Sequence, residues 1–162
     1  METGLAGSGE TLQDPKSYIL EQFGLPQLDL RSYSPLALAY IGDGIYELVV
    51  RTAVMGKGGC QVNKLHRLCS HLTKARAQSE MADILLPHMT GQEEEIYRRG
   101  RNAKSYTTAK NASVNDYRRA TGFEAVMGYL YLSGQFPRLV ELVKFAVDRY
   151  QPQERQDAEA RN

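Results

Sequence analysis

Residues 36–50 read LALAYIGDGIYELVV, and this stretch decides the fold because it is apolar on nearly every side of a helix. Ser34 followed by Pro35 is typical of a helix start, with a capping side chain before a proline suited to the first turn. The helix is predicted to end near Gly56, where KGG forms a loop. A helix of this composition is expected to be buried rather than amphipathic.

The rest of the chain also has helical punctuation. Asp14-Pro15 repeats the capping pattern, and apolar positions at helical spacing predict one helix over about 62–86 that stops at Pro87. Thr90 and Glu93 form a capping-box pattern that opens a short helix, predicted to close at Gly100.

Further helices are predicted from near residue 115 to Gly134 and from Pro137 onward, with a polar loop over RNAKSYTTAKNAS between positions 101 and 113. No alternating pattern typical of strands appears. The predicted fold class is therefore all-α. The predicted organisation is an N-terminal extension over 1–30 with a possible short helix, one helical domain over 31–150 and a polar C-terminal tail over 151–162.

The composition is that of an ordinary globular domain. The chain has 162 residues, 42% of them hydrophobic and 24% charged, which argues against disorder over most of its length. No apolar run is long enough to cross a bilayer. The first fifteen residues resemble neither a secretory signal nor a transit peptide, so a plastid location is not supported. The two cysteines match no redox or zinc spacing, and a reducing cytoplasm is the expected compartment.

Basic residues are concentrated in one part of the chain. Positions 97–119 hold seven arginines and lysines against one acid, which gives this window a net charge of +6. Because the whole chain carries +1, the remainder carries −5. A basic stripe on an acidic body is typical of a protein that binds polyanions, since lysine and arginine displace counterions from phosphates. A merely solvated basic face is the alternative that charge alone leaves open.

Two carboxylates stand out because they lie in the two most apolar predicted helices. Asp43 and Glu47 are the charged residues within 36–50, and Glu124 is the charged residue within 120–132. Burying an unpaired carboxylate costs several kcal/mol, and neither helix offers a basic partner one or two turns away. A shared cation is one solution, and oxygen ligands alone favour a hard ion such as Mg²⁺. The alternatives are a helix cap for Asp43 and, for Glu124, an ion pair with Arg118, Arg119 or a lysine elsewhere in the fold.

The motifs LAYIGDGIYELVV and TGFEAVMGYLYL together resemble the ribonuclease III family, whose members have an apolar helix ending in Leu-Gly-Asp and a second of the form Glu-Ala-Leu-Ile-Gly. The segment RRGRNAKSYTTAKNASVNDYRRATGFEA is similar to one branch, Mini-ribonuclease III. The resemblance spans about 35–150 and implies an all-helical nuclease domain that works as a homodimer, with one Mg²⁺-dependent site in each protomer.

The resemblance assigns Asp43 and Glu124 as the catalytic, metal-binding carboxylates, with Mg²⁺ as the cofactor and Mn²⁺ able to substitute. Glu47, one turn after Asp43, is interpreted as a helix-surface acid and not as a direct metal ligand. Full-length family members carry further acids where this chain has Leu36, Ala39 and Thr121. The site is therefore expected to have a reduced set of carboxylates.

The implied substrate is double-stranded RNA, in this branch the precursor of large-subunit (23S) ribosomal RNA, presented by a ribosomal protein. A catalytically inactive RNA-binding or ribosome-assembly module on the same fold is the alternative function. The residues predicted to contact RNA are Arg98, Arg99, Arg101, Asn102, Lys104, Lys110 and Asn111.

Overall fold

The computed structural model describes residues 14–59, 61–103 and 113–150, and within these ranges all regular structure is helical. The expected all-α fold class is confirmed. None of the described helices combines the length and apolarity needed to span a bilayer. In chain order the elements are α1 (Pro15–Gln22), the 3-10 turn η1 (Leu30–Ser32), α2 (Pro35–Gly56), α3 (Val62–Thr73), α4 (Ala75–Leu85), the 3-10 turn η2 (Leu86–His88), α5 (Gly91–Asn102), α6 (Val114–Leu132) and α7 (Phe136–Arg149).

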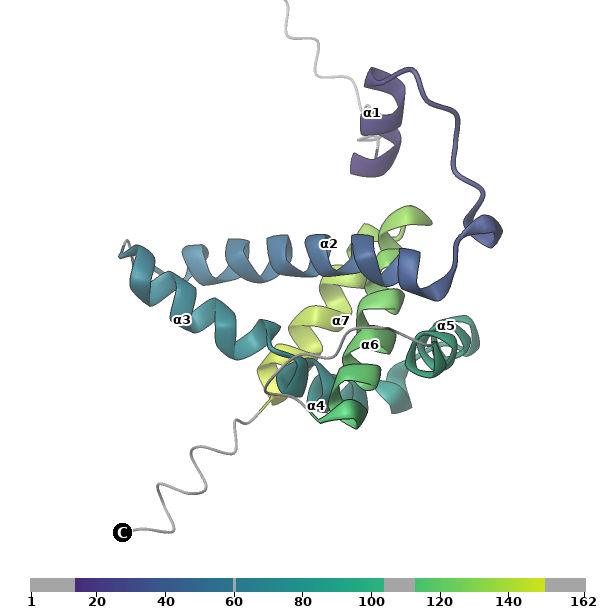
Figure 1. The fold of residues 1–162 in the computed structure, drawn as a ribbon. Coiled ribbons are helices and arrows are strands. Elements are labelled where there is room, and N and C mark those ends of the chain that lie inside the picture. The colour runs from purple at the N-terminus through teal and green to yellow at the C-terminus, as the bar shows by residue number, and fades with distance from the viewer. Residues whose placement is uncertain (1–13, 60, 104–112, 151–162) are drawn as a thin grey trace, which may run out of the picture.

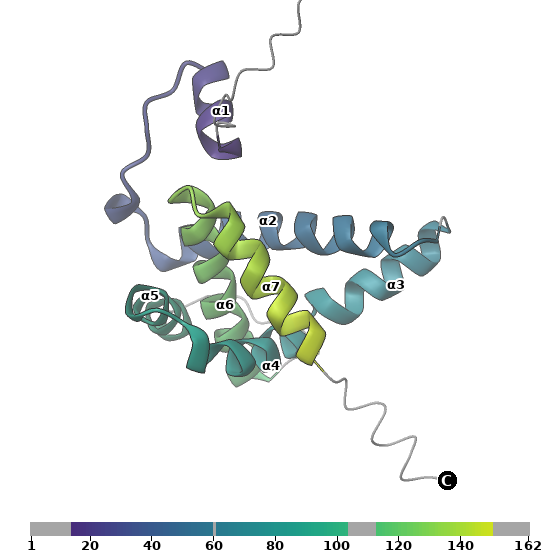
Figure 2. The ribbon, with the colours of Figure 1, turned by 180° about the vertical axis from the view of Figure 1, so that it is seen from behind.

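Helix α6 is the centre of the fold, because α2, α4, α5 and α7 all pack against it. Figure 1 shows α2 running across one side of the molecule, with α6 passing under its N-terminal half and α3 diverging from its C-terminal end. From behind, α7 lies across α6 and reaches towards α2 (Figure 2). Helix α1 stands apart from this body (Figure 1).

The helix starts follow the predicted caps. The side chains of Asp14, Ser34 and Thr90 each accept a hydrogen bond from the backbone three residues later. The Thr90–Glu93 capping box is complete, because the Glu93 carboxylate also accepts from the Thr90 backbone at 3.0 Å. Gly100 does not end α5 as predicted. It lies inside the helix, where a Cβ atom on Gly100 would come within 2.9 Å of the Cα of Gly122 on α6.

The single helix predicted over 62–86 is instead two helices, α3 and α4. The backbone of Lys74 is extended, with φ −67° and ψ 152°, and it separates them. Neither glycine nor proline marks this break. The break lets α4 turn and pack on α6, while α3 stays against α2. Of the loop predicted over 101–113, Arg101 and Asn102 belong instead to α5, which continues past Gly100, and residues 104–112 lie outside the described residues.

The core beneath α2 is built on aromatic packing. The rings of Tyr46 on α2 and Phe123 on α6 meet edge to face, with centroids 4.9 Å apart. The buried Tyr46 hydroxyl donates to the carbonyl of Leu72 on α3 at 2.5 Å. Tyr46 therefore joins three helices and fixes the rotation of α2 about its own axis.

Candidate active site

Two glycines bring α2 and α6 into backbone contact at their crossing. A Cβ atom on Gly42 would lie 1.7 Å from the carbonyl oxygen of Glu124, and one on Gly128 would lie 1.9 Å from the carbonyl oxygen of Leu38. No side chain fits at either position, so the two helices approach as closely as their backbones allow. Asp43 follows Gly42 directly, and this crossing therefore places it beside Glu124.

The two carboxylates meet at this crossing with different exposure. Glu124 is partly buried, whereas Asp43 is exposed, which corrects the prediction that α2 is buried on every side. The α6 side of α2 is covered, but its other side carries exposed Tyr40, Leu48 and Met55. Within the described ranges no other element covers that side, and the apolar sequence alone could not show it.

Electrostatics at the crossing disfavour two negative charges. Burial, and then repulsion by Asp43, raise the pKa of Glu124 to about 8. Partial burial of its carboxyl group, and then the Glu47 carboxylate, raise the pKa of Asp43. Among the described residues, no lysine or arginine pairs with Glu124, and Arg119 pairs with Asp83 instead. The alternative in which an arginine neutralises Glu124 is therefore wrong for Arg119.

The donors present suit a hard divalent cation. Both charged groups are carboxylates, and a cation between them would relieve the repulsion and desolvation that raise their pKa values. Glu47 turns to Arg51, with which it forms an ion pair at 2.7 Å. Within the described residues no cluster of three or more histidine, cysteine, aspartate or glutamate side chains is placed to hold a metal. The crossing thus offers two charged ligands.

Several of the residues predicted to contact RNA gather near the start of α2. Arg98, Arg99 and Asn102 on α5 line, with Pro35 and Ala103, an open hollow of about 390 Å³. Arg98 also pairs with Glu95, and the Arg101 guanidinium lies 5.8 Å from the centre of the Tyr97 ring. Lys104, Lys110 and Asn111 lie outside the described residues.

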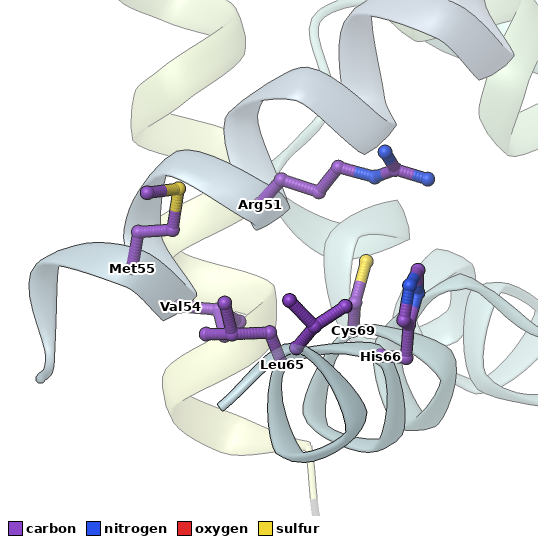
Figure 3. Close-up of a pocket in the computed structure, with 7 residues that line it drawn as sticks. Arg51, Val54, Met55, Leu65, His66 and Cys69 are labelled. Atoms are coloured by element: carbon purple, nitrogen blue, oxygen red, sulfur yellow. The ribbon is translucent and has the colours of Figure 1, made fainter. Parts of the chain in front are cut away.

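A second hollow lies at the far end of α2, where α3 diverges from it. It measures about 250 Å³ and is mainly apolar, with Val54 and Met55 on α2 facing Leu65 and Cys69 on α3 (Figure 3). Arg51 and His66 lie at its rim (Figure 3). No carboxylate is among the residues that line it, which separates this hollow from the Asp43–Glu124 crossing.

Comparison with known proteins identifies the family. The model of the ribonuclease III domain matches residues 36–135. A Mini-ribonuclease 3 from Clostridium tetani is 42% identical over 145 residues, which cover 89% of this chain and 95% of that protein. The chain belongs to the Mini-ribonuclease 3 branch of the ribonuclease III family. A Mini-ribonuclease 3 from Enterococcus faecalis is 46% identical over 75% of this chain and 93% of its own length.

The fold agrees with this membership. A crystal structure of a protein from Fusobacterium nucleatum superposes with a TM-score of 0.67 at 26% identity, covering 74% of this chain and 96% of the other. As a member of the ribonuclease III family, the chain is a metal-dependent endoribonuclease that acts on double-stranded RNA. The matched region contains Asp43 and Glu124 and extends through the crossing that brings them together.

Three positions where further acids are expected in full-length family members carry no carboxylate here. Ala39 is buried, Leu36 is 38% exposed, and the Thr121 hydroxyl donates to the carbonyl of Tyr117 on its own helix at 2.9 Å.

One polar residue near the crossing was not singled out from the sequence. This residue is Gln78 on α4, which is buried beside Glu124. Its helical spacing with Met81 and Leu85 places an amide on an apolar helix face, and this is the sequence signal that could have identified it.

Proposed function

We propose that Asp43 and Glu124 hold Mg²⁺ for hydrolysis of double-stranded RNA, with Mn²⁺ able to take its place. The observation that carries this proposal is their meeting at the glycine crossing of α2 and α6 with no cationic side chain on Glu124 among the described residues. When bound, the ion lowers the pKa of water and stabilises the charge that develops on the scissile phosphate.

The chain's own residues set up this chemistry. Gly42 and Gly128 lock the two helices at one distance, so the two carboxylates keep a fixed separation. Asp43 is exposed, whereas Glu124 is partly buried and approaches the site from α6. Burial of Glu124 excludes water from one side of the site, which strengthens its attraction for a cation.

We infer that duplex RNA enters along α5. Arg98, Arg99 and Asn102 line one open hollow beside the start of α2, and Arg101 lies on the same helix. In this proposal the arginines hold phosphates, and Asn102 contacts sugar hydroxyls, as does Asn111 in the sequence prediction. Lys104 and Lys110 continue the same basic stretch along the chain. Recognition of A-form shape through phosphates and 2′-hydroxyls does not demand a strong sequence preference.

The uncovered face of α2 supports a homodimer. Tyr40, Leu48 and Met55 are 83%, 59% and 66% exposed and fall on one side of the helix at helical spacing. Large exposed apolar side chains on one helix face are typical of an interaction surface. We propose that a second copy covers it, which places the partner beside Asp43 and next to the hollow between α2 and α3 (Figure 3).

For the cellular role, we propose maturation of the ends of precursor 23S ribosomal RNA in the cytoplasm, with a ribosomal protein presenting the substrate. The support is the similarity to proteins named Mini-ribonuclease 3. Salt-sensitive binding of precursor duplexes, compared with unrelated duplexes of equal length, tests this choice of substrate.

The decisive experiment incubates the full chain with duplex RNA in Mg²⁺ and then in EDTA, beside the Asp43→Asn variant. We expect cleavage in Mg²⁺ alone, and a variant that binds RNA but does not cut it. An inactive RNA-binding module would instead leave the RNA intact under every divalent ion. Cleavage by Asp43→Asn at the wild-type rate would reject the assignment of this carboxylate.

A further inference from the structure

Gln78 is a polar residue that the fold buries without a complete hydrogen bond. Its side chain is 1% exposed and sits on the face of α4 that also carries the fully buried Met81 and Leu85. Among the described residues, neither its amide nitrogen nor its amide oxygen has a hydrogen-bond partner of normal geometry. Buried amides are nearly always paired, because desolvation without a partner is costly. An exception of this kind indicates a role for the amide other than packing.

The group beside this amide is the Glu124 carboxyl. Burial and the Asp43 charge raise the pKa of the Glu124 carboxyl, and the neighbouring Gln78 amide acts in the opposite direction, because it favours the charged form. The contact joins α4 to α6, two helices that pack along each other. The Gln78 amide therefore lies beside the Glu124 carboxyl, at a geometry short of a full hydrogen bond.

Packing alone does not account for an amide at this place. Methionine has nearly the same length and volume, and it fills apolar gaps without any polar atom to satisfy. Replacing a poorly paired buried polar group by an apolar one of the same shape is neutral or stabilising. Retaining glutamine therefore works against the stability of the metal-free core.

We propose that Gln78 is a positioning residue: its side-chain amide donates to one oxygen of the Glu124 carboxylate and holds that group in the orientation that binds the metal ion. This inference rests on the proposed role of Glu124 as a metal ligand. Second-layer hydrogen bonds of this kind orient ligands in metal sites, and their loss commonly weakens metal binding by about 10- to 100-fold.

The test measures Mn²⁺ binding to the metal-free full chain by calorimetry, together with the Mn²⁺ concentration that gives half-maximal cleavage of duplex RNA. For Gln78→Met we expect both to shift by about 10-fold towards weaker binding, with an unchanged or higher melting temperature. Ser79→Ala is the matched control, because Ser79 is the neighbouring fully buried residue whose hydroxyl is also unpaired among the described residues. Its metal dependence should equal that of the wild type.

Gln78→Asn keeps an amide but withdraws it by one methylene, and it should weaken metal binding as Gln78→Met does. This second variant decides the matter if Gln78→Met does not fold. Wild-type metal dependence in the folded variants would overturn the positioning role and leave Gln78 as a core residue. Glu124→Gln separates the two levels of the argument: wild-type Mn²⁺ binding in that variant would reject Glu124 as a ligand, whatever Gln78 does.

Discussion

Glu93 at the start of α5 and Glu124 in the middle of α6 are both carried towards the interior by neighbouring helices. Glu93 is 2% exposed, and Arg138 on α7 holds both of its oxygens, at 2.9 and 3.2 Å. Burial acts to raise its pKa, but the hydrogen bonds from Arg138 and from the Thr90 backbone outweigh burial and lower it. Glu124 has no such cation among the described residues, and its pKa rises to about 8.

We infer different roles for the two carboxylates from this difference. Arg138 also donates to the carbonyl of His88 at 2.9 Å, so the Glu93 pair ties α5, α7 and the turn before α5 together. This pair completes itself within the fold. Glu124 has no such partner among the described residues and lies next to the exposed Asp43, where we propose that a cation binds. In the proposed function, Glu93 stabilises the scaffold, whereas Glu124 keeps a metal site available at a cost in stability.

The largest expected effect is on catalysis. Glu124→Gln removes a charged ligand while keeping the size of the side chain, and we expect cleavage of duplex RNA to fall by about a thousand-fold or more, roughly 4 kcal/mol of transition-state stabilisation. Single-turnover cleavage in saturating Mg²⁺ measures it. RNA binding in EDTA should remain, and the folded protein should melt no earlier than wild type. Retention of full cleavage would mean that Glu124 resembles Glu93 in being a scaffold residue.

The next effect is on stability and concerns the other carboxylate. Arg138→Met leaves Glu93 buried without its cation, and we expect the free energy of unfolding to fall by about 3 kcal/mol. Urea denaturation followed by circular dichroism measures this change. Cleavage per folded molecule at low temperature should stay within about two-fold of wild type. A variant that loses cleavage but keeps its stability would contradict the division of roles.

The third prediction uses pH to separate the two acids in metal-free protein. The folded-state pKa of Glu124 is raised, so its contribution to stability is complete below the unfolded value near 4.5 and is lost as pH rises through about 8. Wild type should therefore lose at least about 2 kcal/mol relative to Glu124→Gln between pH 5 and pH 9. Glu93, whose pKa is lowered, acts in the opposite direction. Its contribution to stability is present above the unfolded glutamate pKa and is lost as pH falls through its lowered folded-state pKa.

Unfolding curves in EDTA at several pH values measure this difference between wild type and Glu124→Gln. Adding a divalent ion at high pH should restore stability to wild type and not to the variant, because binding to the folded state adds to its stability. If the difference in unfolding free energy between wild type and Glu124→Gln does not change with pH, the pKa of Glu124 is not raised in the folded protein.

How far the sequence predicted these features depends on whether the cause is local. The caps at Ser34 and Thr90 were predictable because their partners lie three residues away. The extended backbone at Lys74, which divides the predicted 62–86 helix, has no local marker. The Arg138–Glu93 pair joins positions 45 apart in the sequence, and only the packing of α7 against its neighbours creates it.

The candidate site shows the same division. The two motifs predicted Asp43 and Glu124 as a pair, and Gly42 and Gly128, within those motifs, bring the helices together. The exposure of Asp43 was not predicted, because apolar residues around α2 indicate burial without telling whether the same chain or another molecule provides it. Gln78 needed the position of α4, which depends on the break at Lys74.

The smallest expected effect concerns Glu47, which stands between the two cases. It lies one turn after Asp43 and raises the pKa of that residue, yet it pairs with Arg51 at 2.7 Å at the surface. Exposed pairs of this kind contribute about 0.5 kcal/mol or less, so Glu47→Gln should hardly change the free energy of unfolding. Removing one nearby negative charge should weaken metal binding by less than about three-fold, since solvent and Arg51 already screen it. A Mn²⁺ titration of cleavage for Glu47→Gln and Asp43→Asn side by side measures the effect of each variant on metal binding. If the two variants lose cleavage equally, Glu47 is a third ligand that leaves Arg51 when the ion binds, and the site is a three-carboxylate one.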